Sequence, residues 1–215
     1  MIRAHDLGGR PAGPVPEKDD SEVFHTDWHA KALALNLACG ALGAWNIDAS
    51  RFAREQLKDY PSLTYYEKWM AGLTNLLVER GLVTEAELTG PVAIAALAPN
   101  AIRAADVAAA MRKAVPYSRE AGPEPLFQIG DIVRTIPTPR SGHCRLPAYA
   151  AGREGRIILS HGNHVFPNTN ARFEGENPQP LYTVEFTAAS LWGEDAESAD
   201  DAISLDLWQT SLEPK

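Results

Sequence analysis

Hydrophobic side chains recur with two different periods along this chain, and the change falls near Pro116. Between residues 21 and 115 the apolar positions recur every three or four residues, which is the spacing of one face of an α-helix. Beyond residue 126 apolar and polar residues alternate, as they do in short strands with one buried face. The pattern therefore predicts an α+β chain, with an all-helical N-terminal domain over residues 21–115 and a β domain over residues 126–215.

Capping residues divide the helical half into five predicted helices. Side-chain oxygens of Ser, Thr and Asp accept hydrogen bonds from the first N–H groups of a helix, whereas Gly and Pro end helices. The predicted starts are Ser21, Asp48, the capping boxes Thr64–Glu67 and Thr84–Glu87, and Pro99. The first four helices are expected to end at Gly40, before Pro61, at Gly81 and at Gly90.

Short alternating segments divide the C-terminal half into predicted strands, separated by turns rich in Gly, Pro and Asn. These strands are expected at residues 129–136, 155–159, 182–186 and 203–208. Four or five short strands in about 90 residues are typical of a small SH3-like β-barrel. Residues 1–20 and 116–125 carry Gly and Pro but few apolar side chains, so we expect an extended arm and a linker, respectively.

The composition excludes several classes of partner. A net charge of −8 and a pI near 5.2 argue against nucleic acid, because phosphate binding needs a basic face. The sequence has no apolar run long enough to span a membrane and no signal peptide at its start, so a cytoplasmic protein is expected. Cys39 and Cys144 are too few and too far apart for a disulfide framework or a thiolate cage, so no metal site is expected in this chain alone.

Familiar catalytic motifs are missing from the sequence, which has no G-x-S-x-G, H-E-x-x-H, P-loop or G-x-G-x-x-G. His25 and His29 have the helical spacing of a metal-ligand pair, but no third ligand is obvious and a solvated helix face is favoured. Arginines are usually surface charges, and aromatic residues at helical spacing are usually core. Five such residues are nevertheless hard to explain together as structure only: Arg51, Arg145, Tyr65, Tyr66 and Trp69.

Eight short motifs follow one another over nearly the whole chain. The N-terminal half carries His5–Gly9 with Gly13–Val15, Phe24–Trp28, Asp48–Phe52 and Tyr65–Trp69. The C-terminal half carries Gly142–Tyr149, Tyr182–Val184, Leu191–Gly193, and Asp206–Trp208 with Leu212–Pro214. Each motif is weak by itself, but in this order and spacing they resemble the β subunits of nitrile hydratases from end to end.

The resemblance implies a non-metal-binding subunit of a lyase that hydrates nitriles to amides. In that family the α subunit holds cobalt(III) or iron(III) in a cysteine cluster, two of whose sulfurs are oxidised, and the metal acts as a Lewis acid or positions the nucleophile. Carried over by motif, Arg51 and Arg145 hydrogen-bond the oxidised sulfurs, because guanidinium is a fixed fork of donors that stays charged when buried. The motifs favour cobalt, with iron as the alternative, in an αβ unit that is expected to pair further to α2β2.

The resemblance also implies which side chains line the substrate pocket. It places Tyr65, Trp69, Ile47, Ser50 and Asn36 in the wall, and Tyr66 and His143 in supporting positions. Cobalt-type relatives often carry Phe where this chain has Ser50 and Asn36. This difference implies a roomier or more polar pocket and leaves the preferred nitrile open.

Two other readings stay open. A thiocyanate-hydrolase-like subunit would use the same two halves on separate chains, which the uninterrupted segment 116–125 disfavours. A non-enzymatic interaction subunit would use the SH3-like barrel to bind a peptide, since such barrels have many unrelated functions. A peptide-binding barrel, however, has no need of Arg51 in the helical domain.

Overall fold

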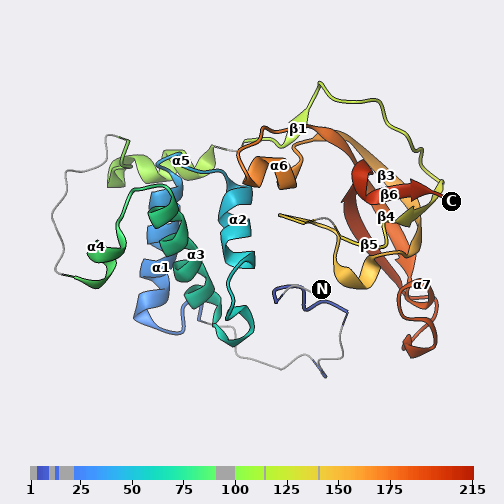
Figure 1. The fold of residues 1–215 in the computed structure, drawn as a ribbon, viewed down its shortest axis with the longest axis horizontal. Coiled ribbons are helices and arrows are strands. Elements are labelled where there is room, and N and C mark those ends of the chain that lie inside the picture. The colour runs from blue at the N-terminus through green and yellow to red at the C-terminus, as the bar shows by residue number, and fades with distance from the viewer. Residues whose placement is uncertain (1–3, 10–12, 15–21, 91–99, 114, 140) are drawn as a thin grey trace. The chain divides into compact units, whose positions relative to one another are not determined.

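The computed structural model describes residues 4–9, 13–14, 22–90, 100–113, 115–139 and 141–215. Two compact units divide the chain, one spanning Arg3–Val115 and the other Pro116–Lys215. The N-terminal unit is helical and the C-terminal unit is built on an antiparallel sheet (Figure 1). The predicted α+β composition is confirmed. None of the described helices has the length and hydropathy needed to cross a membrane.

The described part of the N-terminal unit contains five α-helices and two short 3₁₀ turns. The helices are α1 (Asp27–Gly40), α2 (Ile47–Glu55), α3 (Tyr65–Glu79), α4 (Glu85–Thr89) and α5 (Val107–Arg112). The 3₁₀ turns are Tyr60–Ser62 and Ala104–Asp106. The predicted capping box of α3 is confirmed, because the Glu67 carboxylate accepts hydrogen bonds of 2.7 Å from both the N–H and the hydroxyl of Thr64. These bonds hold the pKa of Glu67 below its usual value, and α4 begins with an equivalent capping box.

Two predicted helix starts are wrong by a few residues. Helix α1 begins at Asp27, because Thr26 is still extended at φ −149° and ψ 152°; Ser21, the predicted cap, lies outside the described residues. Helix α2 is capped by Asn46, whose side-chain oxygen accepts the N–H of Ala49 at 2.9 Å. Asp48, the predicted cap, lies in the first turn of α2 and is buried.

The fifth helix is shorter than the sequence predicts. It begins at Val107, after a 3₁₀ turn, so Ile102 precedes it. Pro99, the predicted start, lies outside the described residues.

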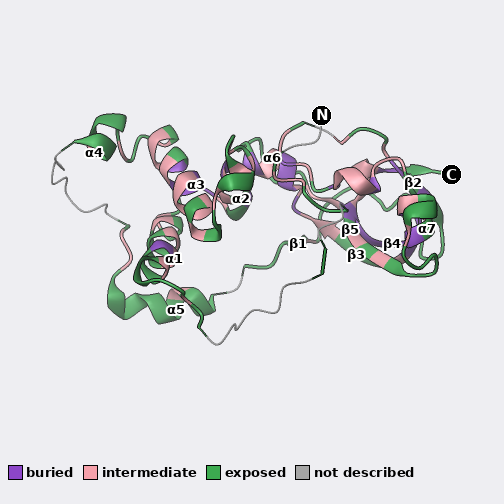
Figure 2. Cartoon of the chain, turned by 90° about the horizontal axis from the view of Figure 1, so that it is seen from below, coloured by how far each residue is buried: buried purple, intermediate pink, exposed green. Residues whose placement is uncertain are grey.

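Small residues hold α2 and α3 close together. The buried core of this unit consists of Trp45, Ala49, Ala53, Leu73 and Leu76. Figure 2 draws buried positions in purple on helices α1 and α3. Gly72 of α3 is also buried, and a Cβ added there would lie 2.6 Å from Cγ of Arg54 and 3.3 Å from its backbone nitrogen. The absence of a side chain at Gly72 therefore lets the backbone of α2 approach α3 at Arg54.

His5, within the segment predicted to be an arm, lies against the C-terminal end of α2. Its ring Nδ1 is 3.1 Å from the backbone oxygen of Glu55, and its Nε2 is 3.8 Å from the Glu55 carboxylate. Its ring also contacts Tyr60 at a centroid distance of 6.0 Å. These contacts attach this part of the segment to the helical unit.

The C-terminal unit is organised around one antiparallel sheet with the strand order β5-β4-β3-β2-β6. The strands are β1 (Ser118–Arg119), β2 (Ile132–Thr135), β3 (Glu154–His164), β4 (Gln179–Thr187), β5 (Ala202–Trp208) and β6 (Leu212–Pro214). The short helices are α6 (Pro167–Ala171) and α7 (Ala188–Trp192). Strand β1 pairs with β3 through Ser118 and His164. All four predicted strands are present, but β2 is shorter than predicted because Gly130, at φ 100°, belongs to a turn before it.

The sheet is not closed in the described residues, so the predicted SH3-like barrel is not confirmed. Strands β5 and β6 are its two edges, and no pairing joins them in the part of the chain that the structure describes. Only the 3₁₀ turn Gln209–Ser211 separates these edge strands in sequence, so the sheet must curl enough to bring its edges together at that end. Closure would need a ladder between β5 and β6, whereas the three residues of β6 pair with β2 along its other edge.

Tyr182 ties the start of the C-terminal core to the sheet. Its side chain is fully buried, and its hydroxyl accepts the N–H of Phe127 at 3.4 Å and donates to the side-chain oxygen of Gln209 at 3.0 Å. Burial raises the pKa of this phenol. The other buried residues of this core are Phe127, Val133, Leu146, Ala150, Ile157, Val184, Phe186, Leu191, Leu207 and Leu212.

We predict that Tyr182→Phe lowers the free energy of unfolding of this unit by about 1–3 kcal/mol, because the buried N–H of Phe127 loses its acceptor. Denaturant titration measures this loss, and a double-mutant cycle with Gln209→Ala isolates the hydroxyl contact. Because the folded pKa is raised, the stabilisation is present below the ordinary tyrosine pKa and is lost as the pH rises through the folded pKa. Equal stability of Tyr182→Phe and the parent protein would contradict the hydroxyl's role.

Candidate functional site

One face of α2 carries a polar stripe that is separate from its buried face. Asn46, Ser50 and Arg54 are four residues apart, which places them above one another along the helix. Ile47, an apolar residue next to this polar stripe, is 45% exposed. The stripe faces the open space beside α3 rather than the core.

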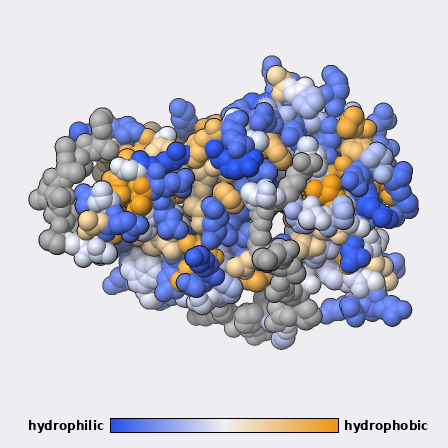
Figure 3. Space-filling model, viewed as in Figure 1, coloured by the Kyte–Doolittle hydropathy of each residue, from blue (hydrophilic) through white to orange (hydrophobic). Residues whose placement is uncertain are grey.

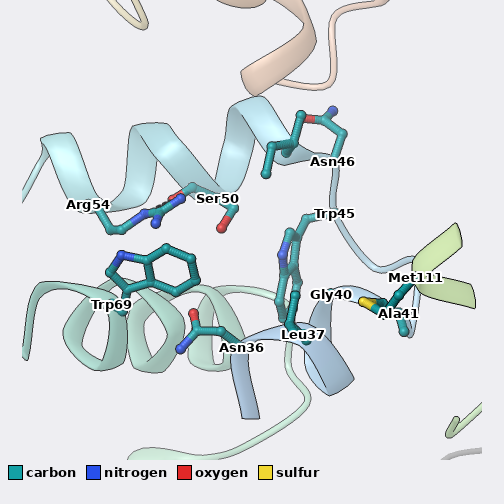
Figure 4. Close-up of a pocket in the computed structure, with 11 residues that line it drawn as sticks. Asn36, Leu37, Gly40, Ala41, Trp45, Asn46, Ser50, Arg54, Trp69 and Met111 are labelled. Atoms are coloured by element: carbon teal, nitrogen blue, oxygen red, sulfur yellow. Dashed lines mark hydrogen bonds between the residues drawn. The ribbon is translucent and has the colours of Figure 1, made fainter. Parts of the chain in front are cut away.

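A pocket of about 340 Å³ lies along this stripe, entirely within the N-terminal unit. Its lining consists of Asn36, Leu37, Gly40, Ala41, Trp45, Asn46, Ile47, Ser50, Arg54, Trp69 and Met111. Figure 4 shows the rings of Trp45 and Trp69 on two sides of the space, with the Ser50 hydroxyl and the Asn36 side chain directed toward it. A volume of this size is within the range of small-molecule sites.

The structure brings four of the five predicted wall residues together in this pocket. They are Asn36, Ile47, Ser50 and Trp69. The fifth, Tyr65, is 63% exposed and lies next to the pocket, with its ring 5.6 Å from that of Trp69. Arg51 is exposed on α2 and is not part of the lining.

Tyr66 lies in a group of aromatic rings at the start of α3. Its ring is 4.6 Å from His29, 5.2 Å from Tyr65 and 6.4 Å from Trp69. Phe24 and Trp28 also contact it, and Trp28 is 41% exposed. Figure 3 shows apolar and polar side chains interspersed on the face of the molecule that it draws. Large exposed aromatic side chains in one place are typical of binding surfaces.

Arg54 is a pocket residue that the sequence analysis missed. Its guanidinium carbon lies 4.5 Å from the centroid of the Trp69 ring, and its Nε donates to the backbone oxygen of Ser50 at 3.1 Å. Burial lowers the pKa of Arg54, and the nearby charge of Arg51 lowers it further, although an arginine stays protonated at neutral pH. Arg54 could have been predicted from its spacing, because it lies four residues after Ser50 and so on the same face of the helix. The motif instead contains Arg51.

The predicted C-terminal residues lie in the long connection between β2 and β3. His143 is buried at 1% exposure, whereas Arg145 is exposed. Both line a small cavity with Asn168, whose amide nitrogen donates to the backbone oxygen of Ser141 at 3.2 Å. Gly142 has φ 90° and lies so close to the Asn168 side chain that a Cβ would overlap it. Packing of this turn therefore places Arg145 at the surface of the unit.

Metal ligands do not gather in the part of the chain that the structure describes: no three His, Cys, Asp or Glu side chains are placed to hold an ion. Cys39 lies in α1 and Cys144 in the C-terminal unit, and burial raises the pKa of the Cys39 thiol. His29 stacks on Tyr66, while His25 is exposed before α1. The described residues thus offer no ligand set for cobalt or iron.

Comparison with known proteins accounts for both units. The family models of the nitrile hydratase beta subunit match the chain throughout, the N-terminal one over residues 1–115 and the C-terminal one over residues 116–214. The chain belongs to the nitrile hydratase beta subunit family.

Individual relatives match this chain over nearly its full length. The chain is 37% identical to the nitrile hydratase subunit beta of Pseudomonas putida and 36% identical to the low-molecular weight cobalt-containing nitrile hydratase subunit beta of Rhodococcus rhodochrous, with 100% of each chain covered. The cobalt-containing subunit beta of Pseudonocardia thermophila is 30% identical over 99% of this chain and 96% of its own.

Among solved structures, the recombinant apo-enzyme of thiocyanate hydrolase from Thiobacillus thioparus is 23% identical to this chain. It aligns with a TM-score of 0.42 over 45% of this chain and 82% of that chain. This likeness is too low to bear on fold or function, so the family assignment of the beta subunit rests on the sequence relatives.

We predict that Gly72→Ala lowers the free energy of unfolding of the N-terminal unit by about 1–3 kcal/mol, because the new methyl group overpacks the contact between α2 and α3. The displaced Arg54 should also change the fluorescence of Trp69. The same substitution in a Trp69→Phe background shows which part of the fluorescence change comes from Trp69. Gly40→Ala is the matched control, because a Cβ there meets nothing within 4 Å. Equal stability of the two variants would show that α2 and α3 do not need the glycine.

Proposed function

We propose that this chain is the β subunit of a nitrile hydratase and acts with a metal-carrying α subunit. The reaction adds one water to the C≡N bond: two C–N π bonds and the two O–H bonds of water are replaced by a C=O bond and two N–H bonds. The product is an amide, and no oxidant or reductant is needed. The observation that carries this proposal is the pocket in which Asn36, Ile47, Ser50 and Trp69 converge, on a chain whose full length matches that family.

The pocket walls supply binding and exclusion of water. The indole rings of Trp45 and Trp69 and the side chain of Ile47 offer apolar surface to the organic part of a nitrile. The exposed ring of Tyr65 continues this surface outside the pocket. Asn36 and Ser50 add polar groups to this wall, at positions where the resemblance implies Phe in cobalt-type relatives, and so favour substrates with polar substituents.

Two arginines act toward the partner in this proposal. Arg51 is exposed on the helix that also contributes Ile47 and Ser50 to the pocket, and Arg145 is exposed on the packed turn between β2 and β3. Each would donate hydrogen bonds to an oxidised, anionic cysteine sulfur of the α subunit. Such charge-assisted bonds are short and strong, and they hold the acceptor in one orientation. His143 and Tyr66 would support this arrangement by packing, since His143 is buried two residues before the exposed Arg145 and the Tyr66 ring lies 5.2 Å from that of the more exposed Tyr65.

The metal is assigned to the α subunit. Two relatives are named as cobalt-containing, which supports cobalt(III) in the complex, with iron(III) as the alternative. Because the described residues of this chain form no ligand set, its own contribution is to bind the nitrile, orient the anionic ligands and exclude water.

Assembly into αβ units, and further into α2β2, is part of the proposal. Exposed apolar side chains of the N-terminal unit, among them Trp28, Leu35, Leu37, Ile47 and Tyr65, would be covered by the partner. The C-terminal unit is SH3-like in this proposal. Its sheet is open, but it is curled, and only a 3₁₀ turn separates its two edge strands in sequence.

We predict that Arg51→Lys and Arg145→Lys each lower kcat for nitrile hydration by about 10- to 100-fold, because an ammonium group cannot reproduce the planar fork toward an oxidised ligand. Activity on a small aliphatic nitrile, measured in the purified complex, checks this. Arg112→Lys, an exposed arginine on α5, is the matched control and should leave kcat unchanged. Full activity of both test variants in an intact complex would remove these arginines from the mechanism.

Co-purification tests the subunit assignment itself. A tagged form of this chain, expressed in its native cells, is expected to recover an equal amount of a cysteine-cluster subunit with about one cobalt or iron ion per pair. Recovery of the folded chain alone, without metal, would contradict the proposal and favour a non-enzymatic interaction subunit.

A further inference from the structure

A half-buried guanidinium group, that of Arg54, lines the pocket. Within the described residues its charge is met by the ring of Trp69 and by the nearby charge of Glu55, but by no carboxylate at ion-pair distance. Its Nε is used by the backbone oxygen of Ser50, which leaves the two terminal nitrogens of the fork as donors. A charged group that has lost part of its hydration gains from an acceptor that can replace the missing water.

Arg54 is the strongest hydrogen-bond donor among the side chains of the lining. The amide nitrogen of Asn36, a weaker donor, is already directed to the backbone oxygen of Ala32 at 2.9 Å and to the sulfur of Met70 at 3.8 Å. Asn46 uses its side-chain oxygen to cap α2. A ligand in this pocket that carries a hydrogen-bond acceptor would therefore bind to Arg54, the charged side chain of this lining.

The walls next to Arg54 are flat and aromatic. Trp69 lies directly beneath the guanidinium, and Trp45 faces the same space from the other side (Figure 4). Offset or edge-to-face packing on indole rings favours a planar aromatic ligand. The cation also polarises this end of the pocket, whereas Leu37 and Met111 make the opposite end apolar.

We propose that this pocket selects aromatic nitriles whose ring carries a carboxylate, with the ring between Trp45 and Trp69 and the carboxylate on Arg54. This inference rests on the proposed function and names the substrate class of the same site. Arginine and carboxylate match in a bidentate geometry, and Arg51 nearby adds positive charge. An arginine with only a structural role would instead affect folding and leave the choice of substrate unchanged.

Discrimination between two substrates tests the proposal in the purified complex. The ratio of kcat/KM for 4-cyanobenzoate to kcat/KM for benzonitrile is expected to fall about tenfold in Arg54→Gln, because one charge-assisted contact is lost. The ratio cancels any loss that both substrates share. Arg112→Gln removes an equal charge from the helix that carries Met111 and is expected to keep the ratio within about twofold. An unchanged ratio in Arg54→Gln would overturn the proposal.

Binding of benzoate, which has no nitrile group, tests the same contact without turnover. The Kd of benzoate for the complex, followed by tryptophan fluorescence, is expected to rise about tenfold in Arg54→Gln and less in Arg54→Lys. Equal Kd values in parent and Arg54→Gln would overturn the inference even in an active enzyme. A complex that hydrates no nitrile but still binds benzoate through Arg54 would instead overturn the proposed function. If Arg54→Gln does not fold, the comparison of Arg54→Lys with the parent protein decides the point.

Discussion

The close packing of α2 on α3 is the contact on which the candidate site depends. Ala49 and Ala53 of α2 and Gly72 of α3 leave so little volume between the helices that their backbones approach at Arg54. This approach brings the Arg54 guanidinium over the ring of Trp69. A larger side chain at any of the three small positions would separate the two walls of the pocket.

A pocket built in this way combines rigid walls with exposed apolar surface. Trp69 belongs to α3, and Trp45 lies in the connection between α1 and α2 but is part of the buried core, so packing against the core positions both rings. Several apolar groups of the same unit remain exposed, including Ile47 and Tyr65. This exposed apolar surface lowers the solubility of the isolated chain. Such exposure is typical of a subunit that functions in a complex.

The C-terminal unit contributes through a different constraint. Its sheet is curled but open, and the turn before β3 is fixed by the contact between Gly142 and Asn168. This turn buries His143 and exposes Arg145, two residues apart. A single packed turn therefore separates a structural side chain from one that is available to a partner.

The sequence by itself determined the helical and β halves, the capping boxes and four strands, because these follow from local periodicity and capping preferences. The resemblance by motif also predicted which residues form the pocket wall. Four of them, Asn36, Ile47, Ser50 and Trp69, line one pocket. Cap choice between Asn46 and Asp48 could not be predicted, because either side chain can accept an N–H group of a helix that begins just after it.

Only the tertiary structure decided which of these residues share a site. Arg51 and Arg54 look alike in the sequence, but the packing of α2 on α3 turns Arg54 into the pocket and leaves Arg51 exposed. The open sheet was likewise decided by long-range pairing, since β6 joins β2 rather than β5. Local patterns carry no information on such contacts, because the energy that selects them comes from residues far apart in the chain.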